Sequence, residues 1–169
     1  LPVLHVFGGA FTVAGDRLAD GIACHEPVSG VWSGLGAGLQ GGAVRALAVL
    51  GNGDLVAAGA FTASGATPLA RIARWNGSAW LPLGLGLNGD VAELAVRGNG
   101  DLVAVGTFSQ AGGAPAAMVA RWNGTSWQAL AQSLGGSFVS LDAVVATANG
   151  EVVVGGNFAS IDGVTAAAV

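Results

Sequence analysis

The sequence predicts an all-β fold built from a repeated unit of four short antiparallel strands. Three observations predict it: several markers share a period near 48 residues, Asn-Gly pairs recur at regular positions, and the 169 residues include 30 Gly but only 9% charged residues. A repeat with one fixed period is the signature of a repeat architecture, so it determines the fold class more strongly than any single segment does. The composition is too apolar and too poor in charge for a disordered chain.

Aromatic residues carry the repeat. A Gly-x-Phe element occurs four times and ends at Phe11, Phe61, Phe108 and Phe158. The spacings between these residues are 50, 47 and 50. Tryptophans follow these elements at spacings of 48 and 47 residues, at Trp32, Trp80 and Trp127. The strings Arg-Trp-Asn-Gly and Leu-Gly-x-Gly-Leu each occur twice with the same period. Several independent markers with one period make chance a poor explanation.

One unit, from residue 44 to residue 84, divides into four strands. The expected strands are the apolar runs 44–49, 55–61, 70–75 and 79–83. A loop that contains Gly and Pro joins the second strand to the third. Six of the seven Asn residues precede Gly. This pair is the strongest short hairpin signal, because type I′ turns need positive φ at both central positions.

Four antiparallel strands in roughly 40 to 50 residues describe one blade of a β-propeller. Middle strands rich in Ala, Gly and Val suit sheets that neighbouring blades bury on both faces, and Trp would fill the wider outer space. We expect one propeller segment of about 3.5 blades and 14 strands, with units at 1–40 (partial), 41–87, 88–135 and 136–169 (partial). Apolar residues at helical spacing are missing, which excludes a helical repeat. A β-solenoid remains an alternative, although its rungs are normally shorter.

The predicted strands do not close a ring. The first unit supplies a second, third and fourth strand, and the last unit supplies a first, second and third. The first strand of the last unit could complete the first unit, but the second and third strands of the last unit would then be left over. Either further blades lie outside this segment or partner chains complete the assembly, and unpaired strand edges predict self-association.

The repeats resemble those of the kelch and galactose-oxidase central-domain propellers. The shared features are an apolar strand that ends in a Gly doublet (Val152 to Gly156) and aromatic pairs such as Trp75 with Trp80. The Trp-Asn-Gly strings are most similar to repeats of uncharacterised secreted bacterial proteins. The resemblance covers the full chain and implies the propeller architecture and a secreted protein, but no particular function. Trp stands where kelch repeats carry Tyr, and the copper chemistry of galactose oxidase needs Tyr, which this chain lacks entirely.

Charge and composition exclude several classes of partner. The formal net charge is −4 and no cluster of basic residues exists, so neither nucleic acid nor a membrane-surface anchor is expected. Apolar runs are too short for insertion into a membrane, because a spanning helix needs roughly 20 residues. Cys24 is the single cysteine, which excludes an intrachain disulfide, and we expect it to be inert.

Candidate ligand-binding residues are sought where one unit departs from its siblings. The first unit departs most, with the polar residues Asp16, Asp20, His25 and Glu26. These residues could gather as metal ligands or as an acid/base pair. The alternative is a degenerate repeat with a solvated loop, and we expect no metal site.

A second candidate group lies on the first strand of each unit, which lines the central channel of a propeller. Alignment on the Asn-Gly turns places Arg45, Ala92 and Asp142 in one register, with Glu93 one residue later. Arg45, Glu93 and Asp142 are therefore candidate ligand-binding residues, or else solvated residues of the channel rim. The turn acids Asp54, Asp101 and Glu151 are expected to bond turn amides, and Arg74 and Arg121 to brace the outer strands.

The sequence thus favours a non-enzymatic interaction module on the outside of the cell, adhesin-like, that binds protein or glycan. No catalytic residue and no cofactor is predicted. A structural building unit of a larger assembly or filament is the alternative, and a fragment of a propeller enzyme is the third hypothesis. The fold alone decides among none of these, because propellers host many unrelated activities.

Overall fold

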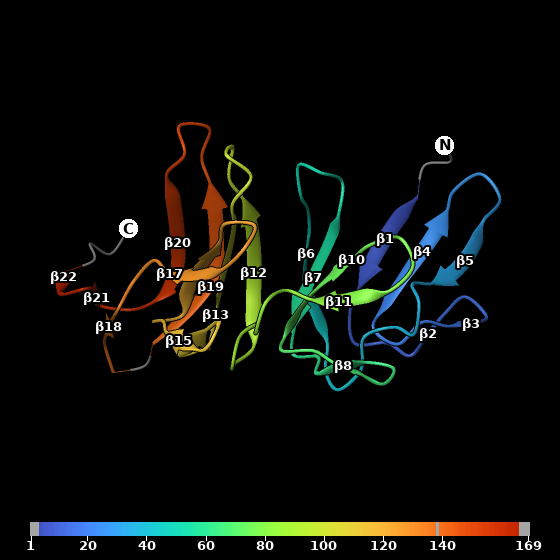
Figure 1. The fold of residues 1–169 in the computed structure, drawn as a ribbon, viewed down its shortest axis with the longest axis horizontal. Coiled ribbons are helices and arrows are strands. Elements are labelled where there is room, and N and C mark those ends of the chain that lie inside the picture. The colour runs from blue at the N-terminus through green and yellow to red at the C-terminus, as the bar shows by residue number, and fades with distance from the viewer. Residues whose placement is uncertain (1–3, 138, 166–169) are drawn as a thin grey trace.

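The computed structural model describes residues 4–137 and 139–165, and every regular element in these residues is a β-strand (Figure 1). No helix in this part of the chain is long and apolar enough to cross a membrane. The all-β prediction is confirmed. The strands form small antiparallel sheets that follow one another along the chain.

The second and third units each form a complete four-stranded sheet with the same strand order. The second unit's sheet, in the order β11-β10-β7-β6, consists of β6 (Val44–Val49), β7 (Leu55–Gly59), β10 (Ile72–Trp75) and β11 (Trp80–Pro82). The third unit's sheet, in the order β12-β13-β16-β17, consists of β12 (Val91–Val96), β13 (Leu102–Gly106), β16 (Val119–Trp122) and β17 (Trp127–Ala129). These bounds confirm the four predicted strands of a unit.

The first and fourth units are incomplete within the described residues. The first contains β1 (His5–Gly8), β4 (Ile22–Glu26) and β5 (Val31–Gly34). The fourth contains β19 (Ser140–Ala146) paired with β20 (Val152–Asn157). The predicted third strand of the fourth unit lies outside the described residues.

A short hairpin stands in each unit where the sequence predicted only a loop. The four hairpins are β2 (Val13–Ala14) with β3 (Arg17–Leu18), β8 (Ala63–Ser64) with β9 (Thr67–Pro68), β14 (Gln110–Ala111) with β15 (Ala114–Pro115), and β21 (Ser160–Ile161) with β22 (Val164–Thr165). The segment before each of the last three units pairs with its hairpin, through the bridges Gln40–Ala63 and Leu87–Ala111 and through β18 (Leu134–Gly135) on β21. The count of 14 strands was too low because it omitted these elements.

The expected type I′ conformation of the Asn-Gly turns is wrong. Gly77 has a φ of 97°, but Asn76 is not among the residues with positive φ. Instead, the Asn76 side-chain oxygen accepts hydrogen bonds from the amides of Ser78 and Ala79, at 3.0 and 2.9 Å. Asn123 makes the same bonds in the third unit. The side chain therefore holds the turn, as Asn commonly does.

Apolar side chains between successive units form three core clusters, one at each junction. Tryptophan ties each of the first two junctions to the preceding linker: the indole Nε1 of Trp80 donates to the Leu35 carbonyl at 3.1 Å, and that of Trp127 to the Leu83 carbonyl at 2.8 Å. Gly36 and Gly84 let the aromatic pair approach, since a Cβ there would lie 2.9 Å from Trp75 or Trp122. The aromatic pair of each of these units thus packs on the Leu-Gly-x-Gly-Leu string that precedes the unit.

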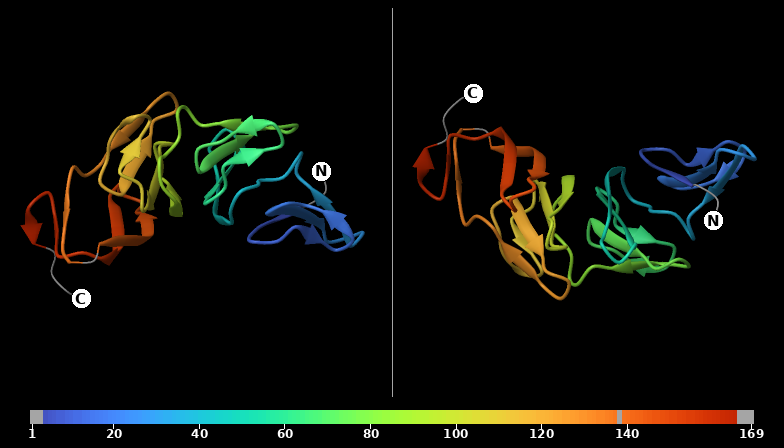
Figure 2. Two further views of the ribbon diagram at one scale, coloured as in Figure 1. Left: turned by 90° about the horizontal axis from the view of Figure 1, so that it is seen from below. Right: turned by 90° about the horizontal axis from the view of Figure 1, so that it is seen from above.

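The units follow one another along an open arc, and the two ends of the described chain lie far apart (Figure 2). Strand β12 packs beside β6 on one side and beside β19 on the other, so the first strands of three units are neighbours. The turns between first and second strands lie at one edge of the arc and the short hairpins at the other (Figure 1).

Candidate functional site

Arg45, Ala92 and Asp142 occupy the same structural position, as the sequence alignment predicts, and the candidate Glu93 lies one residue later. The register of each first strand shifts at one residue, between Val44 and Ala46 in β6, between Val91 and Glu93 in β12, and between Leu141 and Ala143 in β19. Arg45, Ala92 and Asp142 are these extra residues. A bulge leaves its extra residue unpaired and turns its side chain away from the regular ladder.

The structure does not gather these residues around one ligand site. Arg45 forms an ion pair with Asp90, with an N–O distance of 3.1 Å. Glu93 accepts a hydrogen bond from the backbone amide of Val144 in the next unit, at 2.8 Å. Asp142 is exposed and accepts a bond from the Ser140 hydroxyl. Arg45 and Glu93 therefore hold neighbouring units together.

The polar residues of the first unit are also dispersed. Asp16 is exposed and lies 3.5 Å from Arg17, while Glu26 accepts a bond from the Ser29 hydroxyl across its turn. His25 stacks on Trp32, with ring centroids 4.6 Å apart. Among the described residues, no three His, Cys, Asp or Glu side chains lie close enough to hold a metal ion. This arrangement supports neither a shared metal site nor an acid/base pair among the polar residues of the first unit.

His25 takes the place of a tryptophan. The Trp75–Trp80 and Trp122–Trp127 pairs occupy the corresponding strands, with centroids 5.4 and 5.6 Å apart. Trp80 and Trp127 are 2% and 7% exposed, so neither can stack on a sugar. The aromatic pairs thus belong to the scaffold.

Two of the turn acids, Asp54 and Asp101, pair with arginines of the third strand. The Arg74 guanidinium donates to Asp54 at 2.7 Å, and Arg121 donates to Asp101 at 3.0 Å. The Arg74 bond holds the pKa of Asp54 below its usual range, with a further bond from Asn52. Arg121 also donates to the Gln128 side chain on β17, as the expected bracing of the outer strands requires. The bond of Arg74 instead joins the third strand to the turn between the first two strands.

The expected bonds from turn amides to these two carboxylates are replaced by side-chain bonds, since Asp54 and Asp101 accept from the side-chain amides of Asn52 and Asn99. The backbone amides of the two acids in turn donate to the side-chain oxygens of the same Asn residues.

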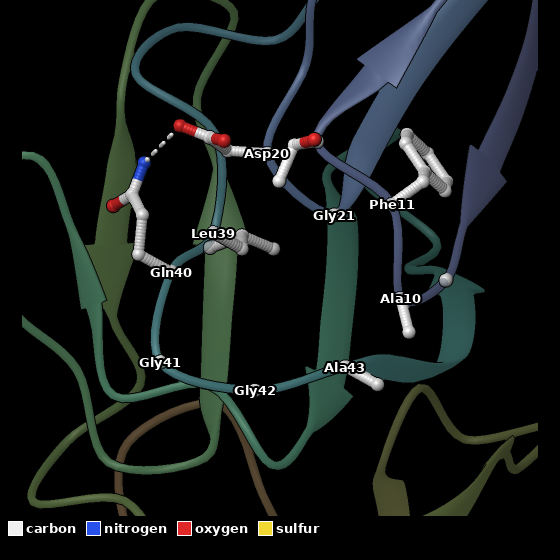
Figure 3. A pocket seen from close by; sticks show the side chains of 11 residues that line it. Ala10, Phe11, Asp20, Gly21, Leu39, Gln40, Gly41, Gly42 and Ala43 are labelled. Carbon is white, nitrogen blue, oxygen red and sulfur yellow. Dashed lines mark hydrogen bonds between the residues drawn. The ribbon is translucent and has the colours of Figure 1, made fainter.

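Asp20, one of the first-unit candidates, lines a pocket. This pocket, of about 320 Å³, opens between the first and second units and is lined by Gly9, Ala10, Phe11, Thr12, Asp20, Gly21, Leu39, Gln40, Gly41, Gly42 and Ala43. Asp20 is its only charged lining residue and accepts a bond from the Gln40 amide at 3.2 Å (Figure 3). Phe11, Leu39 and small residues form the rest of the wall. We call this space the first-junction pocket.

One residue of the pocket wall has a left-handed backbone conformation that recurs in the second and third units. Gly21, with a φ of 80°, stands directly before β4, as Arg71 (65°) stands before β10 and Met118 (61°) before β16. In all three units the carbonyl of this residue accepts the same backbone bond, from Gly9, Gly59 and Gly106. The backbone is therefore identical at this position, while the side chain differs.

At the second junction, an arginine fills the equivalent space. The Arg71 guanidinium donates to the carbonyl of Ala60, and its Nε lies 3.7 Å from the Asp90 carboxylate of the next unit. At the third junction, Met118 lines a pocket of about 390 Å³. Sequence reasoning missed this position, although an alignment of Gly21 with Arg71 and Met118 would have found it. Neither a protein-family model nor a curated protein matches this chain.

Proposed function

We propose that the units are successive blades of a β-propeller and that the chain is a non-enzymatic interaction module of the extracellular or cell-surface kind. The propeller arrangement is supported by two matching four-stranded sheets, by three neighbouring first strands and by the open arc in which the units lie. The extracellular location rests on the resemblance of the repeats alone.

We infer that the module binds its partner through a cationic group in the first-junction pocket. The observation that carries this inference is Arg71, whose guanidinium occupies the equivalent space one junction later. The two spaces share one backbone, since Ala10 and Gly21 correspond to Ala60 and Arg71. Where the chain supplies no side chain, a partner can supply one.

The chemistry of the wall fits a guanidinium or ammonium group. The Asp20 carboxylate provides a negative charge, and charge-assisted hydrogen bonds are stronger than neutral ones. The carbonyl of Ala10 corresponds to the carbonyl that Arg71 bonds at the next junction. Phe11 and Leu39 can cover the apolar stem of an arginine or lysine side chain. An arginine side chain on a partner protein meets all three conditions.

The inference is tested by titrating the protein with N-acetyl-arginine amide and following backbone amides by NMR. We expect saturable shifts confined to the pocket, at Gly9, Gly21 and Gly41. Asp20→Asn should weaken binding at least tenfold, while Asp16→Asn, the exposed neighbour outside the pocket, should leave it unchanged. Equal shifts with N-acetyl-norleucine amide, or none in either titration, would refute the cationic site.

The structural building unit is kept as a second candidate because of the apolar side chains exposed at both ends of the arc. Phe7 in the first unit is 44% exposed, and Val145 and Val153 in the fourth are 59% and 56% exposed. An exposed apolar face on a soluble domain marks an interaction site or an aggregation liability.

A further inference from the structure

We propose that Asn76 and Asn123 are modification sites of the folded chain, where each Asn loses ammonia by attack of the following glycine and becomes aspartate or isoaspartate. Both residues stand in the turn between the third and fourth strands of a unit, which we call the outer turn. Asn52 and Asn99 precede glycine in the turn between the first and second strands, which we call the inner turn. The proposal does not depend on what the first-junction pocket binds.

The reaction needs only an Asn-Gly pair and water. The backbone nitrogen of Gly attacks the side-chain carbon Cγ of Asn, so that a new N–C bond forms while the bond from Cγ to Nδ2 breaks. The amide proton of Gly passes through solvent to Nδ2, which leaves as ammonia. Water then adds to one carbonyl of the cyclic imide and opens it to a carboxylate, with no change in oxidation state. Glycine favours the attack because no Cβ shields its nitrogen.

The attacking nitrogen differs between the two kinds of turn. Access of solvent does not separate them, because the Asn residues of both are exposed. In the inner turns, the Gly53 amide donates to the Leu50 carbonyl at 2.8 Å and the Gly100 amide to the Arg97 carbonyl at 2.9 Å. The corresponding amides of the outer turns donate no hydrogen bond to any described residue. An amide proton held in a hydrogen bond is harder to remove, so the outer turns have the freer nucleophile.

The side-chain carbonyl of the outer turns is also better prepared for attack. Negative charge develops on Oδ1 as the nitrogen adds, and donors already directed at such an oxygen stabilise that charge. The Asn76 Oδ1 accepts from the Ser78 amide at 3.0 Å, from the Ser78 hydroxyl at 3.1 Å and from the Ala79 amide at 2.9 Å. Asn123 has the matching three donors in the third unit. In the inner turns the corresponding oxygen accepts one bond from a described residue.

The inner turns, in contrast, hold the leaving amide in place. The Asn52 Nδ2 donates to the Asp54 carboxylate at 3.0 Å, and the Asn99 Nδ2 donates to Asp101 at 3.1 Å. Loss of ammonia there breaks a charge-assisted hydrogen bond. The Nδ2 atoms of the outer turns donate to no residue in the described part of the chain, so their loss breaks no such bond. Nucleophile, carbonyl and leaving group therefore all favour the outer turns.

The rates are measured on the folded protein, incubated at neutral pH in water labelled with heavy oxygen and mapped by tandem mass spectrometry over time. The label enters only when the imide opens, so it separates this reaction from changes present at the start. Asn76 and Asn123 should take up label at least about fivefold faster than Asn52 and Asn99. In urea, where the turns are lost, the four sites should react at similar rates. Equal rates in the folded chain, faster inner turns, or outer turns that stay unlabelled would each overturn the proposal.

The hydroxyl donor allows a matched comparison inside one chain. Ser78→Ala removes one of the three donors to Asn76, whose rate should fall about two- to tenfold, while Asn123 keeps its rate. Thr125→Val should slow Asn123 in the same way. The control Ser126→Ala should not, because Ser126 bonds Asn123 through its backbone amide. Circular dichroism checks that each variant is folded, and an unchanged rate at Asn76 in Ser78→Ala or at Asn123 in Thr125→Val would contradict the proposal.

Discussion

The first and second junctions share one backbone but differ in their side chains: Asp20 and Gly21 at the first correspond to Ala70 and Arg71 at the second. Gly21 leaves a pocket at the first junction, and Arg71 fills the corresponding space at the second with a guanidinium that bonds Ala60 and approaches Asp90. The difference teaches where specificity can arise in a repeated fold. At this position the scaffold fixes the backbone conformation, while the side chain varies from Gly21 to Arg71 to Met118.

The same comparison extends to the outer faces of the units. Trp127 is buried and hydrogen-bonded to the preceding linker, whereas Trp32 is only half-buried beside His25 and Phe7. The first unit has no preceding unit among the described residues to cover this pair. Substitutions at matched positions should therefore cost less in the first unit than in the third.

The largest expected difference concerns the glycine at the end of the second strand. A Cβ on Gly106 would lie 2.1 Å from the Asp90 carbonyl oxygen, whereas a Cβ on Gly9 would meet only the Phe11 ring, at 3.0 Å. We expect Gly106→Ala to lower the free energy of unfolding by about 2 to 3 kcal/mol and Gly9→Ala by less than about 1 kcal/mol. Urea denaturation measures both, and equal losses would contradict the comparison.

The next effect concerns the tryptophan at the start of the fourth strand. Trp127→Phe removes a buried hydrogen bond to the Leu83 carbonyl and leaves that oxygen without its partner. It should cost about 2 kcal/mol, and Trp32→Phe less than about 1 kcal/mol. Thermal unfolding of the two variants gives the ranking, and a reversed order would show that the first unit is packed as tightly as the third.

A smaller effect is the acid dependence that Asp54 confers. Its pKa is lowered by the bond from Arg74, so its ionised form stabilises the folded state above the unfolded pKa of about 3.9. This stabilisation is lost as the pH falls through the folded pKa. Asp54→Asn should therefore melt below the wild type at neutral pH, and the gap should close in acid. A difference in melting temperature that stays constant over the pH series would show that the carboxylate charge does not stabilise the fold.

The smallest effect concerns Cys24, which stands where the siblings carry Arg74 and Arg121. Cys24 is buried in the first-junction core, and this burial raises the pKa of its thiol. Since the thiolate is the reactive form, Ellman's reagent should react at least about tenfold more slowly with the native protein than with the urea-unfolded chain. Equal rates would mean that the first junction opens readily.

Periodicity in the sequence was enough to predict the long strands and the shared register of Arg45, Ala92 and Asp142, but not the bulge at these residues. The two-residue strands of the hairpins were missed because so short a segment has no hydrophobic period. The Asn-Gly turns were assigned the wrong conformation, because the Asn side chain can hold a turn without a positive φ of its own.

The candidate site was predicted only in part. Asp20 was identified as a polar departure of the first unit, and it does line a pocket. Asp16, His25 and Glu26 were grouped with it because they are near in sequence, but the strands carry them apart. The residues around Gly21 in the sequence do not indicate its importance, because that depends on the backbone conformation that Gly21 shares with Arg71 and Met118.

The propeller arrangement is tested most directly by a crystal structure of the chain. The account predicts β6, β12 and β19 side by side around a common axis, with the indoles of Trp80 and Trp127 bonded to the Leu35 and Leu83 carbonyls. Units stacked in line as the rungs of a straight rod, with each Trp indole turned to solvent, would contradict it.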